Sequence, residues 1–332
     1  MIKSILISSV EKKIKNIKSR YKKKYGAVFF DVKVKSFNDF IILEGAVLSE
    51  KQKNEVFVTV KEIIKNNRVK NSIRVLSDPK DDLEIGWGII TADVADMRVK
   101  LSDKKNTTGE SPASNKSSLG GLASQAMKGD FVRILLKEGI WYLAQTRDLT
   151  IGWVDSSRIA LSKWEIIKKE WIKTKRVRAG EVVRKRLAKN IQSKFLRFLE
   201  KYLNAQYLLG GMTGQSIDCS GLTQKFYSDI FGILLPRHSS DQALCGEKIE
   251  LSAAHFGDLV FLRRKATKVA HIGIVVEKFK TPKAKRQTSN SILILNARRE
   301  IGGVAIEDLP DILKFYNLIS VRRIIKQVLI KK

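Results

Sequence analysis

The chain is poor in cysteine, since only Cys219 and Cys245 occur among its 332 residues. Two cysteines provide no disulfide framework. Neither a Cys-x-x-Cys nor a His-x-x-x-His spacing occurs, and a structural zinc site needs four ligands, so the sequence indicates neither a metal nor another cofactor. Cys245 lies where a predicted helix ends, and a cysteine in such a place ordinarily fills the core.

The sequence also lacks a long apolar segment, and no transmembrane segment is predicted. The apolar part of residues 1–10 is short and is followed at once by Glu11 and several lysines, which is unlike a secretory signal. The sequence therefore predicts a cytoplasmic location.

Acidic residues are scarce relative to basic ones: 63 Lys and Arg stand against 34 Asp and Glu, which gives a net charge of +29. Such an excess favours an acidic partner. We do not expect nucleic acid, because the lysines are dispersed and no zinc-knuckle spacing or strand rich in exposed aromatics is present to contact bases. An anionic polymer or membrane surface remains open, as does a lysine-rich composition that serves no ligand.

The most informative stretch that is present is residues 218–222, Asp-Cys-Ser-Gly-Leu. A turn-rich run, residues 210–214, precedes it, and a helical pattern with apolar residues on one face follows. Asp218 or Ser220 suits the first turn of this helix and Gly232 suits its end. Free backbone N–H groups and the helix dipole stabilise a thiolate, so we expect a lowered pKa for Cys219 and a nucleophilic role.

A nucleophilic thiol needs a base, and the chain has three histidines. His271 begins a predicted strand, residues 270–276, and a rigid strand end can hold an imidazole within reach of a thiol on a helix. His238 lies in a predicted turn and His255 precedes another predicted strand. Both are better explained as surface or supporting residues.

Several separated motifs resemble the NlpC-type cysteine peptidases in type and order: residues 207–211 (YLLGG), 218–222 (DCSGL), 235–242 (LPRHSSDQ), 257–261 (GDLVF) and 271–274 (HIGI). The resemblance covers residues 189–325. It implies a papain-like α+β domain, made of a helix bundle plus an antiparallel sheet. It also implies cleavage of amide bonds in bacterial cell-wall peptides, typically after γ-D-glutamate.

The resemblance also implies further site residues. The Tyr207 hydroxyl would orient the cysteine or the oxyanion, unless this tyrosine is only structural, and Asp218 and Ser220 would support substrate or oxyanion. The Cys219 N–H would hold the oxyanion. Asn296 takes a position where relatives often have a second histidine, and its amide can accept the Nδ1–H of His271. The basic loop 278–290 is expected to border the cleft.

Length and a 43% hydrophobic content indicate an α+β multidomain chain with two or three packed cores. Residues 1–78 predict an αββαβ order that resembles a BON domain, which implies an envelope or phospholipid-binding module; a small structural domain explains the pattern equally well. The first helix is basic and amphipathic, so its apolar stripe lies either on a membrane or, more commonly, on a neighbouring sheet.

Residues 87–162 contain short strands separated by turns, typical of a small barrel, and resemble the bacterial SH3-like domains that precede NlpC-type peptidases. Residues 104–121, rich in Ser, Thr, Asn and Gly, are predicted to be a mobile insertion. Residues 163–188 are predicted to form a basic linker helix clamped by two tryptophans, or else a site for an anionic polymer.

Together the resemblances imply a cysteine peptidase that hydrolyses γ-D-glutamyl-diamino acid bonds in muropeptides. In relatives that recycle wall fragments, an acidic residue that holds the substrate amine often precedes the run that ends in Gln125. Here Leu122 and Ala123 occupy that place, so the sequence does not predict this selectivity. The alternatives are a hydrolase of intact peptidoglycan and a non-catalytic protein that binds the wall or an anionic polymer. Either would place the protein in the cell envelope or outside the cell by a non-standard route.

Overall fold

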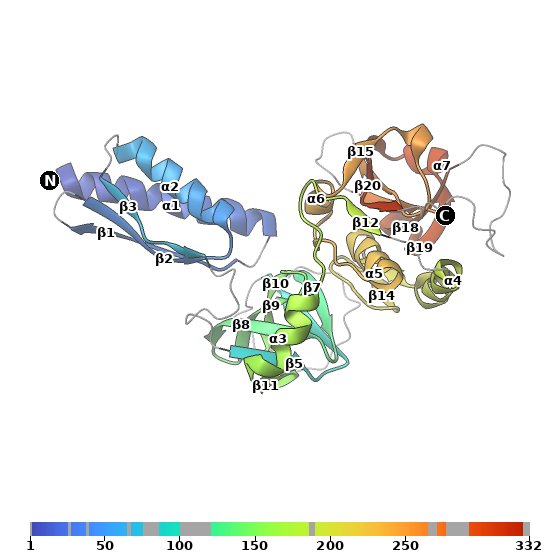
Figure 1. Ribbon diagram of the computed structural model, residues 1–332, viewed down its shortest axis with the longest axis horizontal. Coiled ribbons are helices and arrows are strands. Elements are labelled where there is room, and N and C mark those ends of the chain that lie inside the picture. The colour runs from blue at the N-terminus through green and yellow to red at the C-terminus, as the bar shows by residue number, and fades with distance from the viewer. Residues whose placement is uncertain are drawn as a thin grey trace, which may run out of the picture. The chain divides into compact units, whose positions relative to one another are not determined.

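The computed structural model describes residues 2–25, 28–37, 40–64, 68–75, 86–99, 121–185, 190–264, 271–276 and 292–327. The chain divides into two compact units. Figure 1 labels their helices and strands. Unit 1 comprises Met1–Ala123, Phe131–Gln145 and Ile151–Trp164, and unit 2 comprises Ser124–Asp130, Thr146–Thr150 and Glu165–Lys332. Apart from Gly121, the predicted insertion lies outside the described residues, as does the basic loop 278–290.

Unit 1 begins with two helices and a four-stranded sheet. The elements are α1 (Ile2–Tyr25), β1 (Phe30–Phe37), β2 (Phe40–Val47), α2 (Glu50–Ile64), β3 (Val69–Asn71) and β4 (Arg74–Val75). β1 and β2 are antiparallel, whereas β3 and β4 run parallel to β2. The apolar stripe of α1, carried by Val10, Ile14 and Ile17, is buried in the core that also holds Leu43 of the sheet. This stripe therefore packs inside the protein.

The strands between Gly86 and Ser162 form a seven-stranded sheet in the order β11-β5-β8-β9-β10-β6-β7. Their bounds are β5 (Gly86–Ile90), β6 (Val94–Arg98), β7 (Leu122–Met127), β8 (Phe131–Glu138), β9 (Trp141–Thr146), β10 (Ile151–Asp155) and β11 (Ile159–Ser162). Trp87, Met97 and Ile134 are buried in it. The SH3-like and BON-like assignments of these two regions stay predictions.

The predicted linker helix occupies only the first part of residues 163–188. Helix α3 (Trp164–Lys173) ends there, and the chain then forms strand β12 (Val183–Lys185), which pairs in parallel with β21 (Ile325–Gln327). A strand contact with a distant part of the chain thus replaces the helix expected from local pattern.

Unit 2 is built on an eight-stranded sheet in the order β14-β13-β19-β18-β17-β16-β20-β15. Its strands are β13 (Gln206–Tyr207), β14 (Ser216–Ile217), β15 (Glu247–Ile249), β16 (Leu259–Arg263), β17 (His271–Val275), β18 (Leu293–Arg298), β19 (Gly303–Asp308) and β20 (Asn317–Arg323). The helices are α4 (Ile191–Tyr202), α5 (Cys219–Phe231), α6 (Ser239–Gln242) and α7 (Leu309–Leu313).

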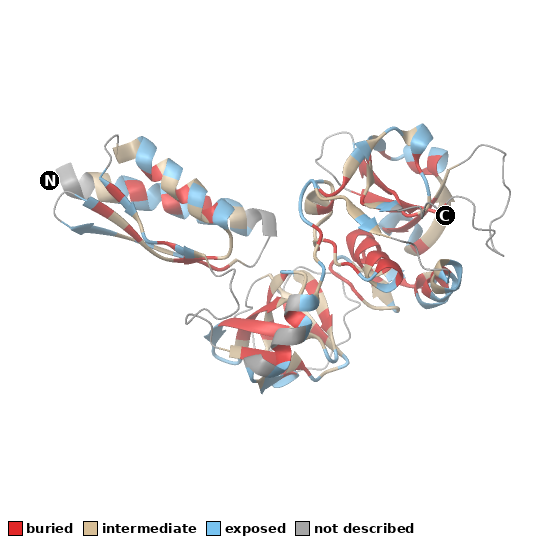
Figure 2. Ribbon diagram, in the orientation of Figure 1, coloured by how far each residue is buried: buried red, intermediate tan, exposed pale blue. Residues whose placement is uncertain are grey.

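Apolar residues cover both faces of this sheet. Successive residues of β16 enter different clusters: Phe261 joins the core of α4 and α5, and Val260 joins the core of α7. In the first core, Phe226 makes edge-to-face contacts with Phe195 and Phe198 at centroid distances of 6.1 and 5.5 Å. Figure 2 shows α5 as largely buried. Helix α5 also packs against β17 and β18, so its first residue is held on a rigid base.

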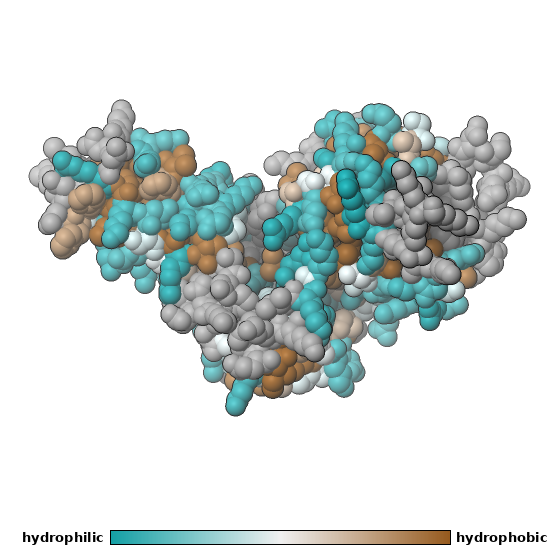
Figure 3. Space-filling view, viewed as in Figure 1, coloured by the Kyte–Doolittle hydropathy of each residue, from teal (hydrophilic) through white to brown (hydrophobic). Residues whose placement is uncertain are grey.

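Hydrophilic side chains lie on the visible face of both compact units (Figure 3). Among the described residues, no helix is both long enough and apolar enough to cross a membrane.

Candidate active site

Cys219 is the first residue of helix α5, as predicted. Asp218 is the N-cap, with φ −97°, and its side chain accepts a hydrogen bond from the Gly221 N–H at 2.7 Å. At the other end Gly232 has φ 65°, the left-handed conformation that favours glycine. The predicted caps are confirmed, and they fix where the helix begins and therefore where the sulfur lies.

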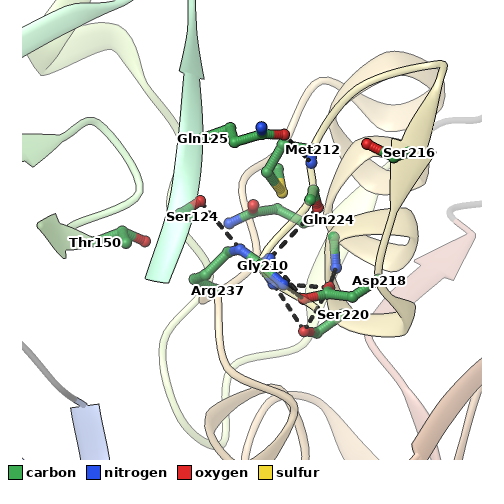
Figure 4. A network of polar contacts seen from close by, with 12 residues as sticks. Ser124, Gln125, Thr150, Gly210, Met212, Ser216, Asp218, Ser220, Gln224 and Arg237 are labelled. Atoms are coloured by element: carbon green, nitrogen blue, oxygen red, sulfur yellow. Dashed lines mark hydrogen bonds and ion pairs between the residues drawn. The ribbon is translucent and has the colours of Figure 1, made fainter. Parts of the chain in front are cut away.

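A buried ion pair supports this helix start (Figure 4). Arg237 Nη1 donates to Asp218 Oδ1 at 2.9 Å and Nη2 donates to Oδ2 at 2.7 Å, in a bidentate arrangement. The Gly210 N–H donates to Oδ2 at 2.7 Å. Burial acts to raise the pKa of Asp218, but Arg237 and the backbone donors outweigh it and hold the pKa below its ordinary value.

Ser220 completes the same network. Its Oγ donates to Asp218 Oδ1 at 3.1 Å and accepts from Arg237 Nη1 at 2.8 Å. Asp218 and Ser220, predicted to support substrate or oxyanion, thus have buried partners: Gly210 in the loop before the helix and Arg237 in the segment after it.

Residues outside the predicted set contribute to this network. Arg237 Nε donates to Ser124 Oγ at 3.1 Å, and Gln125 Oε1 accepts from the Met212 N–H at 3.0 Å. Gln224 Nε2 donates to Asp148 Oδ2 at 2.7 Å. Ser124, Gln125 and Asp148 belong to the chain segments that join unit 2. The one signal in the sequence that could have pointed to this network is the motif at residues 235–242, which contains Arg237.

The predicted lowering of the Cys219 pKa is wrong for the resting protein. The residue is only 8% exposed. Burial, followed by the nearby Asp218 carboxylate, raises the pKa of the thiol to about 12. The backbone N–H of Ile272 opposes this rise and places the sulfur next to the start of β17. The sequence indicated the helix start but not how completely the fold would enclose it.

His271 and Asn296 are brought together as predicted. His271 Nε2 and Asn296 Oδ1 lie 2.9 Å apart on the neighbouring antiparallel strands β17 and β18. One detail of the prediction is wrong, because the ring nitrogen facing the amide is Nε2 and not Nδ1. Nδ1 is the ring nitrogen that does not face the amide.

Burial also determines the charge of the histidine. It lowers the pKa of His271 to about 4, although the Asn296 hydrogen bond acts to raise it. Burial thus favours the neutral form of both side chains, the Cys219 thiol and the His271 imidazole.

Tyr207 ends strand β13 and is half-buried. Burial, with smaller contributions from Cys219 and Asp218, raises the pKa of its hydroxyl above the ordinary value. The hydroxyl therefore remains protonated and can donate a hydrogen bond near Cys219. The Arg299 guanidinium lies over the Tyr207 ring, 5.8 Å from its centroid.

Sequence reasoning missed the residue that packs on the histidine. The ring centroids of His271 and Tyr316 are 5.2 Å apart, with an interplanar angle of 33°. The Tyr316 hydroxyl donates to Glu300 at 3.1 Å, and Glu300 pairs with Arg264. This contact restricts the rotation of the imidazole.

Cys219 at the start of α5, the backbone N–H of Ile272 at its sulfur, and the Asn296 amide on His271 together form a Cys-His-Asn set of the kind found in papain-like thiol hydrolases. Residues 204–304 match the model of the NlpC/P60 family. This part of the chain is therefore an NlpC/P60 domain, with the mixed α/β peptidase fold of that family.

Curated relatives resemble the same part of the chain. The probable endopeptidase NlpC homolog of Haemophilus influenzae is 38% identical over 76 residues, 23% of this chain and 39% of that protein. The murein DD-endopeptidase MepS/murein LD-carboxypeptidase of Escherichia coli K12 is 36% identical over 93 residues, 27% of this chain and 48% of that protein. The chain thus spans less than half the length of these relatives.

A third relative is the gamma-D-glutamyl-L-lysine dipeptidyl-peptidase of Bacillus subtilis, 35% identical over 77 residues, 23% of this chain and 26% of that protein. Among solved structures, an NlpC/P60 endopeptidase from Photobacterium damselae subsp. piscicida has a TM-score of 0.46 at 18% identity, over 72% of this chain and 71% of that one. A likeness at that level supports no argument about function.

Proposed function

We propose that this protein is a cysteine peptidase that hydrolyses amide bonds in bacterial peptidoglycan stem peptides. The observation that carries the proposal is the buried His271–Asn296 hydrogen bond beside a cysteine at a capped helix start, within an NlpC/P60 domain. The names of the relatives, a murein endopeptidase and a γ-D-glutamyl-L-lysine dipeptidyl-peptidase, support the substrate class.

The chemistry follows from the neutral resting pair. The Cys219 sulfur attacks the carbonyl carbon while its proton passes to His271 Nδ1. The developing oxyanion accepts from the Cys219 N–H and from the Tyr207 hydroxyl. The imidazolium then gives its proton to the leaving amine, and water hydrolyses the thioester. Asn296 accepts from Nε2 throughout and keeps the ring oriented.

The bond we assign is the one between γ-D-glutamate and a diamino acid, in free wall fragments. Ser124 and Gln125 contact the arginine and the loop that support the nucleophile, so the segment Ser124–Asp130 is the part of the chain we infer to limit substrate size. Hydrolysis of intact wall is the second candidate, because the +29 net charge favours binding to an acidic polymer.

Mass spectrometry of products tests this assignment. The full-length protein is given free L-Ala-γ-D-Glu-diamino acid peptides and, separately, intact sacculi. We expect the free peptides to be cut after γ-D-glutamate and the sacculi to be cut poorly. Efficient cutting of sacculi would replace the recycling assignment with the wall-hydrolase one, whereas binding to sacculi with no cleavage of either substrate would indicate a non-catalytic protein.

A further inference from the structure

Asn296 has two different kinds of neighbour at the two ends of its amide. It is fully buried on β18. Its Oδ1 faces His271 Nε2, whereas its Nδ2 donates to Glu307 Oε2 at 3.1 Å. The carbonyl oxygens of Ile294 and Ala305 lie at 3.4 Å from the same nitrogen. All three groups on that side are acceptors.

These acceptors determine which way the amide points. A carboxylate and two backbone carbonyls can only accept, so the amide end that faces them must be the NH₂ group. The oxygen must then face His271, and it can only accept. His271 Nε2 therefore carries the hydrogen, and in a neutral imidazole this leaves Nδ1 as the free base.

Glu307 is itself fixed. Arg298 Nη2 donates to Glu307 Oε1 at 2.5 Å and Nε donates to Oε2 at 3.2 Å. The side chains of Arg298 and Glu307 are 4% and 16% exposed. In the β18–β19 ladder Asn296 lies opposite Ala305 and Ile294 lies opposite Glu307, which places Glu307 diagonally across from Asn296.

We propose that Glu307, held by Arg298, is a positioning residue that selects the amide orientation of Asn296 and thereby the tautomer of His271 that can accept the thiol proton. This inference rests on the proposed function of Cys219 and His271. The hydrogen bonds of the Glu307 carboxylate go to Asn296 and Arg298, so Glu307 acts on the imidazole through Asn296.

The test is Glu307→Gln, whose amide keeps the size of the side chain but can donate as well as accept. We expect kcat for peptide cleavage to fall about tenfold with KM within about twofold. The rate at which iodoacetamide alkylates Cys219, followed by mass spectrometry, should fall in parallel. The acid limb of the pH–rate profile should move to lower pH, because a negative charge that favours imidazolium is removed.

A double-mutant cycle separates positioning from a structural role. In an Asn296→Ala background, Glu307→Gln should change kcat and the alkylation rate by less than about twofold, because the amide that links Glu307 to His271 is absent. Glu247→Gln is the matched control, since Glu247 pairs with Lys326 at the other end of the sheet and should leave all readouts unchanged.

Two results would overturn the inference. One is an equal loss of kcat in both backgrounds; the other is a lower melting temperature with kcat and alkylation unaffected. If Glu307→Gln does not fold, Glu307→Asp, whose shorter side chain withdraws the carboxylate from Asn296 Nδ2, is taken through the same cycle with the same criteria. The alkylation readout needs no substrate, so it decides the inference even if the wild type cleaves no stem peptide.

Discussion

At the scale of single residues, the site is governed by burial. A helix start and its dipole favour a thiolate, but enclosure beside Asp218 favours the thiol more strongly. The same enclosure keeps His271 neutral. Burial thus favours the uncharged form of both side chains, and the Asn296 amide orients the imidazole.

The neutral state of His271 makes stability depend on pH. Its pKa is about 4 when folded against 6.5 ordinarily, so the unfolded chain binds the proton more readily. Stability should therefore fall as pH drops from about 6.5 to 4, by about 2–3 kcal/mol from this residue. Urea unfolding at pH 7 and pH 4.5 measures this. Between the two pH values, the free energy of unfolding of His271→Gln should fall by about 2–3 kcal/mol less than that of the wild type. Identical falls in both proteins would contradict the assigned pKa.

At the scale of elements, the helix that carries the nucleophile was predictable and its long-range partners were not. Local pattern indicates α5, because an apolar face, an aspartate cap and a terminal glycine lie within one stretch. The partners of Asp218, Asn296 and Gln125 come from distant segments, and no local periodicity encodes them. The prediction of a helix over residues 163–188 was wrong for the same reason, because β12 forms a strand by pairing with the distant β21.

The two glycines near the ends of α5 give a matched pair of variants. A Cβ on Gly221 would lie 2.7 Å from the Gly211 oxygen and 2.9 Å from Met212 Sδ, so the helix start must shift. A Cβ on Gly232 meets only the end of Lys185, but its φ of 65° strains any other residue by about 1–2 kcal/mol.

Gly221→Ala should therefore reduce kcat at least about tenfold, because misplacing the nucleophile slows attack. Gly232→Ala should lower the unfolding free energy by about 1–2 kcal/mol with kcat nearly unchanged. Steady-state kinetics and urea unfolding of both variants check this. Equal kcat values would show that the helix start tolerates displacement.

At the scale of the whole molecule, the compact unit that holds the site includes more than the NlpC/P60 match. Segments Ser124–Asp130 and Thr146–Thr150 belong to it, through contacts such as Gln125 with Met212 and Asp148 with Gln224. The peptidase is thus supported by chain that precedes it in the sequence.

A chain that begins at Lys163 lacks those segments and should be less stable than one that begins at Gly86. We expect a difference of about 2 kcal/mol or more, since each buried polar group that loses its partner costs about 1–3 kcal/mol. Urea unfolding followed by tryptophan fluorescence measures it. Equal midpoints would show that the two segments only rest against the peptidase.

The central claim is that Cys219 attacks the substrate, and the most direct measurement compares the two cysteines of the chain. Cys219→Ala, Cys245→Ala and the wild type are each given free stem peptides, and products are counted by mass spectrometry. Cys245 is fully buried, so Cys245→Ala serves as the control for loss of packing. We expect no products from Cys219→Ala with the fold intact by circular dichroism, and most of the activity from Cys245→Ala. Undiminished cleavage by Cys219→Ala would contradict the account.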